Sequence, residues 1–453
     1  MEALTSEAKG TTELRYCSPS FFLTFHFSLH AFSLSMTIAF KIFGCRLNQA
    51  EGAGFITQFE AAGFSRIPLG DAADVVLVYS CTVTQKAENE CVKTLRHLRA
   101  TQPHAFIVLA GCAAETCNCD LLKGVVDLFV GREQKEDLVR LVGVSMGKGG
   151  VRRDEGGGEM QPRPTTQRAT LKVQDGCAFR CSYCIVPHAR GEPRSRPMEE
   201  CLAEAQSYRD AGFQELVITG CNTACYADGK RNLIDLLKAC LELKGLGRIR
   251  LGSIEPGTVE RDLIDLMASD ARACSFLHLP IQSGCDATLT RMKRRYTIAT
   301  IRNTLDYAFK KIPDLGLGTD MIVGFPGESH EDFRQTCQLV QEYPFSNVHV
   351  FPYSERPGTP AALMEQQVPV SERKRRAKEL SKIADVQRAS YLQRFLGKDV
   401  TFLVEHVDRA GRACGWSAEY LPCAVHGLPA TTRRTLQTFS VRAIVDGTLQ
   451  GGS

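Results

Sequence analysis

Three closely spaced cysteines carry the strongest chemical signal in the sequence. Cys177, Cys181 and Cys184 are separated by three and by two residues, shortly after a β-like run. Three thiolates without a fourth cysteine nearby can hold three irons of a [4Fe–4S] cluster and leave one iron open to another ligand. A zinc site or a CxxC redox pair is the alternative, but zinc sites usually have four ligands and a redox pair needs no third cysteine. The spacing therefore favours a cluster with a reactive iron.

A second set of three cysteines is spread over the first part of the chain. Cys45, Cys81 and Cys112 each lie just after a β-rich run, and helical patterns separate these runs. The carboxyl ends of parallel strands meet at one edge of a sheet, where ligands normally bind, so these thiols are expected to converge on a second [4Fe–4S] cluster. Three buried structural cysteines are the alternative. Others, such as Cys91 and Cys221, share no such position and are interpreted as buried or incidental.

The elements that must position these cysteines predict an α/β protein in three parts. Residues 37–143 alternate strand-like and helical segments, which indicates a parallel α/β sheet domain. Residues 144–168 are glycine-rich and charged and predict a linker. Six further β-runs alternate with helices within 169–397, which predicts a partial (β/α)6 barrel. Short β-like runs in 398–453 predict a small β-barrel.

Composition indicates the cellular compartment of the chain and the kinds of partner it can bind. It has 453 residues with 55 Lys and Arg against 51 Asp and Glu, so affinity for nucleic acid must come from local patches. Nineteen cysteines without a clear secretory signal indicate metal or redox chemistry in a reducing cytoplasm. The apolar run 21–34 is too short to span a bilayer, so no membrane partner is expected. Residues 1–35 are predicted to be a dispensable extension, with initiation at Met36 as a hypothesis.

The first cysteine motif resembles that of the radical S-adenosylmethionine (SAM) superfamily. The resemblance implies that the open iron chelates the methionine part of SAM and that reductive cleavage yields a 5'-deoxyadenosyl radical. Positions near the last cysteine and after successive strands match where that superfamily contacts the cofactor, and the loops of a barrel open on one face. These candidate contacts are Tyr183, Gly220, Ser253, Glu255, Gln282 and Ile322.

Both cysteine sets together resemble the radical SAM methylthiotransferases. The sequence motifs that carry the resemblance are FGCRLNQAE, YSCTVT and AGC, then VQDGC, CSYCIVPHARGEPRSRP and TDMIVGFPGES. Such an enzyme uses two molecules of SAM. One methylates a sulfur at the N-terminal cluster, and the other supplies the radical that abstracts hydrogen from C2 of an adenine in tRNA. The C-terminal part is similar to RNA-binding TRAM domains, and an external electron donor and a sulfur source are implied.

The resemblance leaves several substrates open. The motifs look most like the branch that acts on N6-threonylcarbamoyladenosine next to the anticodon. Isopentenyladenosine in tRNA and a ribosomal protein side chain are the alternatives within the family. A non-catalytic RNA-binding protein stabilised by metal is the alternative from another class. No side chain beyond the cluster ligands is predicted to be catalytic.

A basic helical stretch, residues 371–399, has nine Lys or Arg against four acids. Taken alone, the stretch is better explained as a solvated helix face. The resemblance makes Arg375 and Arg376 of this stretch, with Arg194 and Arg196, candidate contacts to RNA phosphates.

Overall fold

The computed structural model describes residues 36–81, 85–117, 119–147 and 166–452. The predicted extension and most of the predicted linker lie outside these residues.

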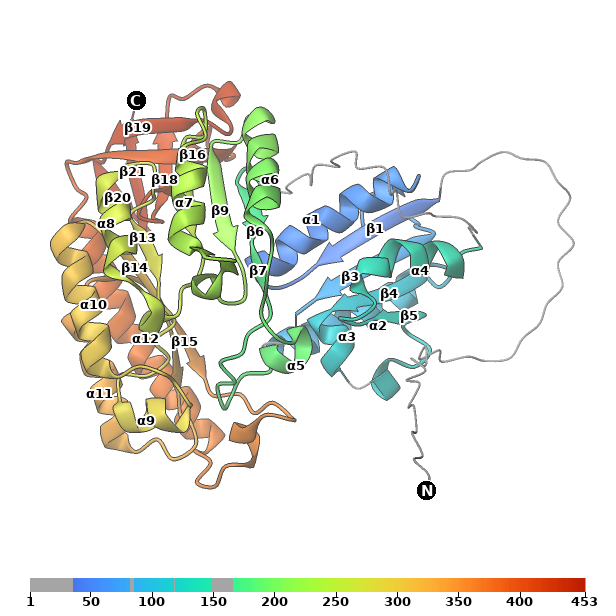
Figure 1. Ribbon diagram of the computed structural model, residues 1–453, viewed down its shortest axis with the longest axis horizontal. Helices are drawn as coiled ribbons and strands as arrows, with labels where there is room; N and C mark the ends of the chain where they lie inside the picture. The colour runs from blue at the N-terminus through green and yellow to red at the C-terminus, as the bar shows by residue number, and fades with distance from the viewer. Residues whose placement is uncertain (1–35, 82–84, 118, 148–165, 453) are drawn as a thin grey trace, which may run out of the picture.

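The N-terminal part is built around a parallel sheet with the strand order β2-β1-β3-β4-β5 (Figure 1). Its strands are β1 (Thr37–Ile42), β2 (Ser65–Arg66), β3 (Val75–Ser80), β4 (Phe106–Gly111) and β5 (Leu128–Val130). Every residue of β3 is buried, as expected for a parallel sheet that is covered on both faces. Its helices are α1 (Arg46–Ala61), α2 (Gln85–Thr101), α3 (Cys112–Thr116) and α4 (Leu138–Ser145). Phe55 and Phe59 of α1 cover one face, and Leu95 and Leu98 of α2 cover the other.

The central part is a curved array of parallel strands with helices outside it (Figure 1). Its strands are β6 (Ala169–Lys172), β9 (Glu215–Thr219), β12 (Arg248–Leu251), β13 (Phe276–His278), β14 (Gly316–Val323) and β15 (Phe345–Pro352). The outer helices are α6 (Met198–Asp210), α7 (Leu233–Leu241), α8 (Arg261–Ser269), α10 (Ile298–Lys311), α11 (His330–Glu342) and α12 (Val370–Gln393). Among the described residues, β12-β9-β6 and β13-β14-β15 form two sheets, which parallel bridges at Ile249–Ala273 and Ser253–His278 connect.

A C-terminal sheet closes the amino ends of these strands. It contains β16 (Asp399–Val407), β17 (Ala413–Ser417), β18 (Pro422–His426), β19 (Leu436–Ser440), β20 (Ala443–Val445) and β21 (Thr448–Gly452). Arg250 of β12 is fully buried, pairs with Glu215 at 2.8 Å and donates to the Ser417 carbonyl at 2.7 Å. Arg248 donates to the Trp416 carbonyl at 2.7 Å. The carboxyl ends of the strands are therefore left for a site.

This arrangement confirms the predicted fold class, an α/β protein with an N-terminal parallel sheet, a partial barrel and a small C-terminal β-structure. Within the described ranges, no helix combines the length and the apolar character that crossing a bilayer requires.

Candidate active site

The first cysteine set occupies one loop at the carboxyl end of the barrel. The loop runs from β7 (Gln174–Asp175) to α5 (Val186–Arg190). The Cys177 amide donates to the Gly191 carbonyl at 3.0 Å, and the Cys184 amide donates to the Cys181 carbonyl at 3.0 Å. Burial and the charges of the two other thiols raise the pKa of Cys184 to about 12. The three thiols lie on one short loop, and metal binding there must displace their protons.

Arg294 lies against this loop, and nothing in its spacing identified it from the sequence. Its guanidinium donates to Cys181 Sγ at 3.1 Å, to the Tyr183 hydroxyl at 3.3 Å and to Glu255 at 2.5 Å. Burial raises the pKa of Glu255, although Arg294 opposes the shift. The side chain of Asn222 is hydrogen-bonded to Cys177.

Two buried oxygen atoms beside the three cysteines, Glu255 Oε1 and Asn222 Oδ1, have no hydrogen-bond partner among the described residues. Buried acceptors are normally satisfied, so this pair fits a ligand that brings hydrogen-bond donors. SAM carries an ammonium group and two ribose hydroxyls that can donate.

Of the other predicted cofactor contacts, Gly220, Ser253 and Gln282 follow β9, β12 and β13, whereas Ile322 lies within β14 and Tyr183 in the cysteine loop. A Cβ at Gly220 would lie 2.9 Å from the Gln174 carbonyl oxygen, so the chain needs glycine there. Ser253 Oγ lies 3.0 Å from His278 Nδ1. Gln282 has a left-handed backbone, with φ of 72°, and accepts a bond from the Ile322 amide at 2.9 Å. Tyr183 packs edge-on against Phe325, with centroids 6.4 Å apart.

The second cysteine set lies at the carboxyl edge of the N-terminal sheet. Cys45 precedes α1, Cys81 follows β3 and Cys112 begins α3. A hydrogen bond from the Cys81 side chain is the main cause that lowers the pKa of Cys45 to about 6. A Cβ at Gly44 would lie 2.4 Å from Cys81 Cβ, so a glycine lets these two segments approach. Cys112 interacts electrostatically with Cys45 and is hydrogen-bonded to Arg190.

A buried charge network joins the N-terminal sheet domain to the barrel. Arg190 at the end of α5 donates to Asn48 at 2.5 Å, to Glu51 of α1 at 3.0 Å and to Asp175 at 2.9 Å. Lys172 donates to Glu51 at 2.5 Å and to Asp175 at 2.6 Å. Burial raises the pKa of Glu51, but its cationic neighbours outweigh burial and bring the pKa to about 2.

The same network places the two cysteine sets on neighbouring elements. Helix α3, which begins at Cys112, packs against α5, which begins two residues after Cys184. A pocket between the two parts is lined by Cys112, Lys135, Asp175, Arg190 and Arg194 among others. The charged side chains that line the pocket are therefore mainly basic, and the pocket is bordered by Cys112 of the second cysteine set.

The four predicted RNA contacts differ in accessibility. Arg376 is 7% exposed and pairs with Glu328 at 2.7 Å, so the prediction that it contacts phosphate is wrong because its guanidinium fastens α12 to the barrel. Arg375 is half-exposed and pairs with Glu372 and Glu379 on the same helix. The remaining two residues are Arg196, which pairs with Glu204, and Arg194, which is exposed at the pocket.

Two family models match the chain. Residues 171–340 match the radical SAM superfamily, and residues 37–131 match the uncharacterized protein family UPF0004. The solved structure of the radical SAM methyltransferase TsrM from Kitasatospora setae matches with a TM-score of 0.54 and 16% identity, over 72% of this chain and 77% of that chain. This likeness supports the fold alone.

Curated relatives match over most of their length. The threonylcarbamoyladenosine tRNA methylthiotransferase MtaB of Bacillus subtilis is 34% identical, over 79% of this chain and 82% of the relative. The protein of the same name from Thermotoga maritima is 35% identical, over 85% and 90%. A tRNA-2-methylthio-N(6)-dimethylallyladenosine synthase from Desulfitobacterium hafniense is 32% identical, over 84% and 90%. The chain therefore belongs to the radical SAM methylthiotransferase family.

Proposed function

We propose that the chain transfers a methylthio group to C2 of N6-threonylcarbamoyladenosine in tRNA, with two [4Fe–4S] clusters and two molecules of SAM. The observation that carries the proposal is that Cys112 of one set begins α3 and Cys184 of the other lies two residues before α5, and that these two helices pack against each other. The names of the relatives from Bacillus subtilis and Thermotoga maritima support this nucleoside as the substrate. The proposed place of action is the cytoplasm.

Cys177, Cys181 and Cys184 would hold the cluster that binds SAM. That cluster, with SAM bound, supplies one-electron chemistry that can remove a hydrogen atom from adenine C2. The guanidinium of Arg294, 3.1 Å from Cys181 Sγ, would stabilise the negative charge that thiolate ligands bring. Glu255 and Asn222 would accept hydrogen bonds from SAM through their unpartnered oxygens.

Cys45, Cys81 and Cys112 would hold the second cluster, which carries the sulfur to be methylated and transferred. Arg190 is hydrogen-bonded to Cys112 and tied to Glu51 and Asp175, so it fixes this edge of the sheet against the barrel. Basic side chains of the pocket beside Cys112, such as Arg194, would contact phosphates of the tRNA. Reductive cleavage of SAM needs an electron and the transferred sulfur must be replaced, so an external electron donor and sulfur source are part of the proposal.

The C-terminal sheet is proposed as a further RNA contact, in the manner of a TRAM domain. A second candidate substrate, dimethylallyladenosine in tRNA, is favoured by the relative from Desulfitobacterium hafniense.

The proposal is tested by mass spectrometry of tRNA nucleosides from cells with and without the gene. Loss of methylthio-threonylcarbamoyladenosine alone supports the proposal, and loss of the dimethylallyl product supports the second candidate. An unchanged profile contradicts both. Complementation by a Cys177→Ala chain should fail, whereas Cys240→Ala, a buried cysteine of α7, should restore the profile.

A further inference from the structure

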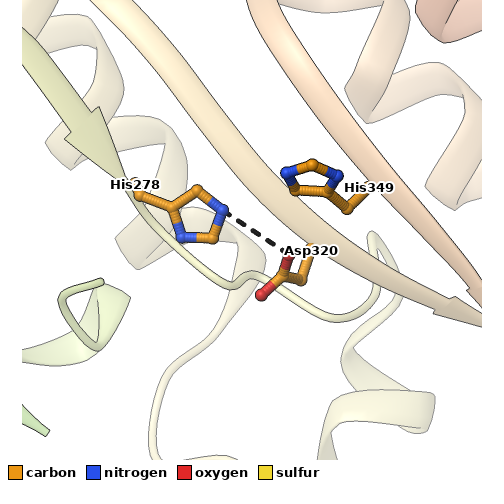
Figure 2. A group of neighbouring side chains, drawn as sticks. All are labelled: His278, Asp320 and His349. Carbon is orange, nitrogen blue, oxygen red and sulfur yellow. Dashed lines mark ion pairs between the residues drawn. The ribbon is translucent and has the colours of Figure 1, made fainter. Parts of the chain in front are cut away.

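Three potential metal ligands, none of them a cysteine of either set, meet on neighbouring strands of the barrel. His278 ends β13, Asp320 lies in β14 and His349 lies in β15. One ligand atom from each of them lies within 4.8 Å of the others. Figure 2 shows the His278 ring directed toward the Asp320 carboxylate, with the His349 ring beside them.

The strand alternation places this group on the inner face of the barrel. In β14, Leu317, Met321 and Val323 are buried in the core against the outer helices. Asp320 stands at the alternate position and therefore points to the inner face. Asp320 pairs in register with His349, so these two side chains are direct cross-strand neighbours.

A glycine provides the space for the third side chain. His278 is in register with Gly318, two residues before Asp320. A Cβ at Gly318 would lie 2.8 Å from Cδ2 of the His278 ring. The absence of a side chain at Gly318 thus allows His278 to reach Asp320, with His278 Nε2 3.5 Å from Asp320 Oδ1.

Each histidine has one ring nitrogen occupied by a polar neighbour. Ser253 Oγ lies 3.0 Å from His278 Nδ1 and can accept its N–H, which leaves Nε2 for a metal. Asn347 Nδ2 lies 2.9 Å from His349 Nε2 and donates to it, so metal binding at His349 Nδ1 requires the Asn347 amide to turn and present its oxygen to an Nε2–H. Histidines that bind metals usually have the other ring nitrogen hydrogen-bonded, because this bond fixes the tautomer and the ring orientation. A simple ion pair between His278 and Asp320 would not need His349 or its contact with Asn347.

We propose that His278, Asp320 and His349 bind one divalent transition-metal ion of the zinc type. Two donors bound to zinc lie roughly 3.4 Å apart, given bonds of about 2.0–2.1 Å and tetrahedral geometry, and His278 Nε2 and Asp320 Oδ1 are 3.5 Å apart. His349 is exposed, so its ring can rotate inward to complete the group. Two imidazoles and a carboxylate suit such ions better than Mg²⁺ or Ca²⁺, which prefer oxygen ligands.

The ion would keep open coordination positions, because three protein ligands do not fill a tetrahedral shell. These positions face the inside of the barrel, since all three ligands come from the inner faces of adjacent strands. The site is distinct from both proposed clusters and does not depend on the proposed substrate.

The test uses the full chain with its clusters reconstituted under anaerobic conditions, so that the six cluster cysteines are occupied. Zn²⁺ is titrated in competition with a chromophoric chelator, and bound zinc is counted by mass spectrometry. The unmodified chain should bind about one zinc ion more tightly than it binds any further zinc ion. His349→Ala and Asp320→Asn should lose at least about 100-fold in affinity, and Asn347→Ala about tenfold.

Two further variants separate lost ligation from lost folding. His349→Cys retains a metal-ligating atom and should still bind zinc. His330→Ala removes an exposed imidazole at the start of α11 and should bind zinc like the unmodified chain. The proposal is overturned if the unmodified chain binds no zinc, or if His349→Ala and Asp320→Asn bind it with unchanged affinity while retaining their clusters and far-UV spectra.

Discussion

Replacing Glu51 with Gln should weaken the contact between the N-terminal sheet domain and the barrel, and so lower the stability of the folded chain. The Glu51 carboxylate is 4% exposed and contacts Arg190, Lys172 and Lys135, with the Tyr79 hydroxyl at 2.7 Å. The amide of Gln has nearly the same shape but no charge. The variant therefore leaves three buried or half-buried cations with Asp175 as the remaining carboxylate of the network.

The magnitude follows from the pKa of Glu51. Burial raises this pKa, and Arg190, Lys135 and Lys172 outweigh burial, so it falls to about 2 from the ordinary value of 4.5. A depressed carboxyl pKa stabilises the folded state above the unfolded value and loses that effect as the pH falls from 4.5 to about 2. The difference corresponds to a loss on the order of 3 kcal/mol at neutral pH, within the range for breaking a buried ion pair.

Anaerobic calorimetry at pH 7 measures this loss. A change of about 3 kcal/mol in a cooperative unit of 150–250 residues lowers Tm by roughly 6–12 °C. The same difference should appear at pH 6 and pH 8, because Glu51 stays ionised across this interval. Glu60→Gln is the control, since Glu60 lies on the same helix and has no ion pair among the described residues; its Tm should change by less than about 2 °C. A Tm of Glu51→Gln within 2 °C of the unmodified chain at pH 7 would refute the reasoning.

Three other perturbations address the two cysteine sets. Arg294→Gln removes the cation beside Cys181 Sγ, and the rate of 5'-deoxyadenosine formation should fall about tenfold or more at unchanged iron content; an unchanged rate would contradict the role of Arg294. Cys177→Ala should abolish 5'-deoxyadenosine formation and leave about four irons per chain, whereas retained formation would rule out this cysteine as a ligand. Gly44→Ala places a Cβ 2.4 Å from Cys81 Cβ and should reduce iron from about eight to about four per chain. Gly63→Ala is its control, because Gly63 also has positive φ but open space around it; equal iron loss in both would point to backbone strain instead.

The sequence predicted much of the fold because its strands are short and regular. Runs such as Val75–Ser80 are apolar throughout, which is typical of buried parallel strands, and turn residues bound them. The cysteines could be predicted for the same reason, since each of Cys45, Cys81 and Cys112 directly follows such a run.

The charge network could not be predicted, because its partners are far apart in the sequence. Arg190 and Glu51 are 139 positions apart, and only the docking of α5 beside α1 brings them together. A signal was present in α1, where Asn48 and Glu51 are three residues apart and so share one helix face after Cys45. Arg190 was missed as a buried cation, whereas Arg376 is buried although the sequence suggested a solvent-facing RNA contact. A basic helical sequence does not reveal which of its cations turn inward to pair with a buried carboxylate.

The proposed reaction is tested most directly with purified chain that holds about eight irons and cleaves SAM under reductant. Two tRNAs are supplied together, one with threonylcarbamoyladenosine and one with dimethylallyladenosine, and their nucleosides are measured by mass spectrometry. We expect methylthiolation at C2 of threonylcarbamoyladenosine alone. Methylthiolation of the dimethylallyl nucleoside instead, or of neither nucleoside by chain that still cleaves SAM, would contradict the proposed function.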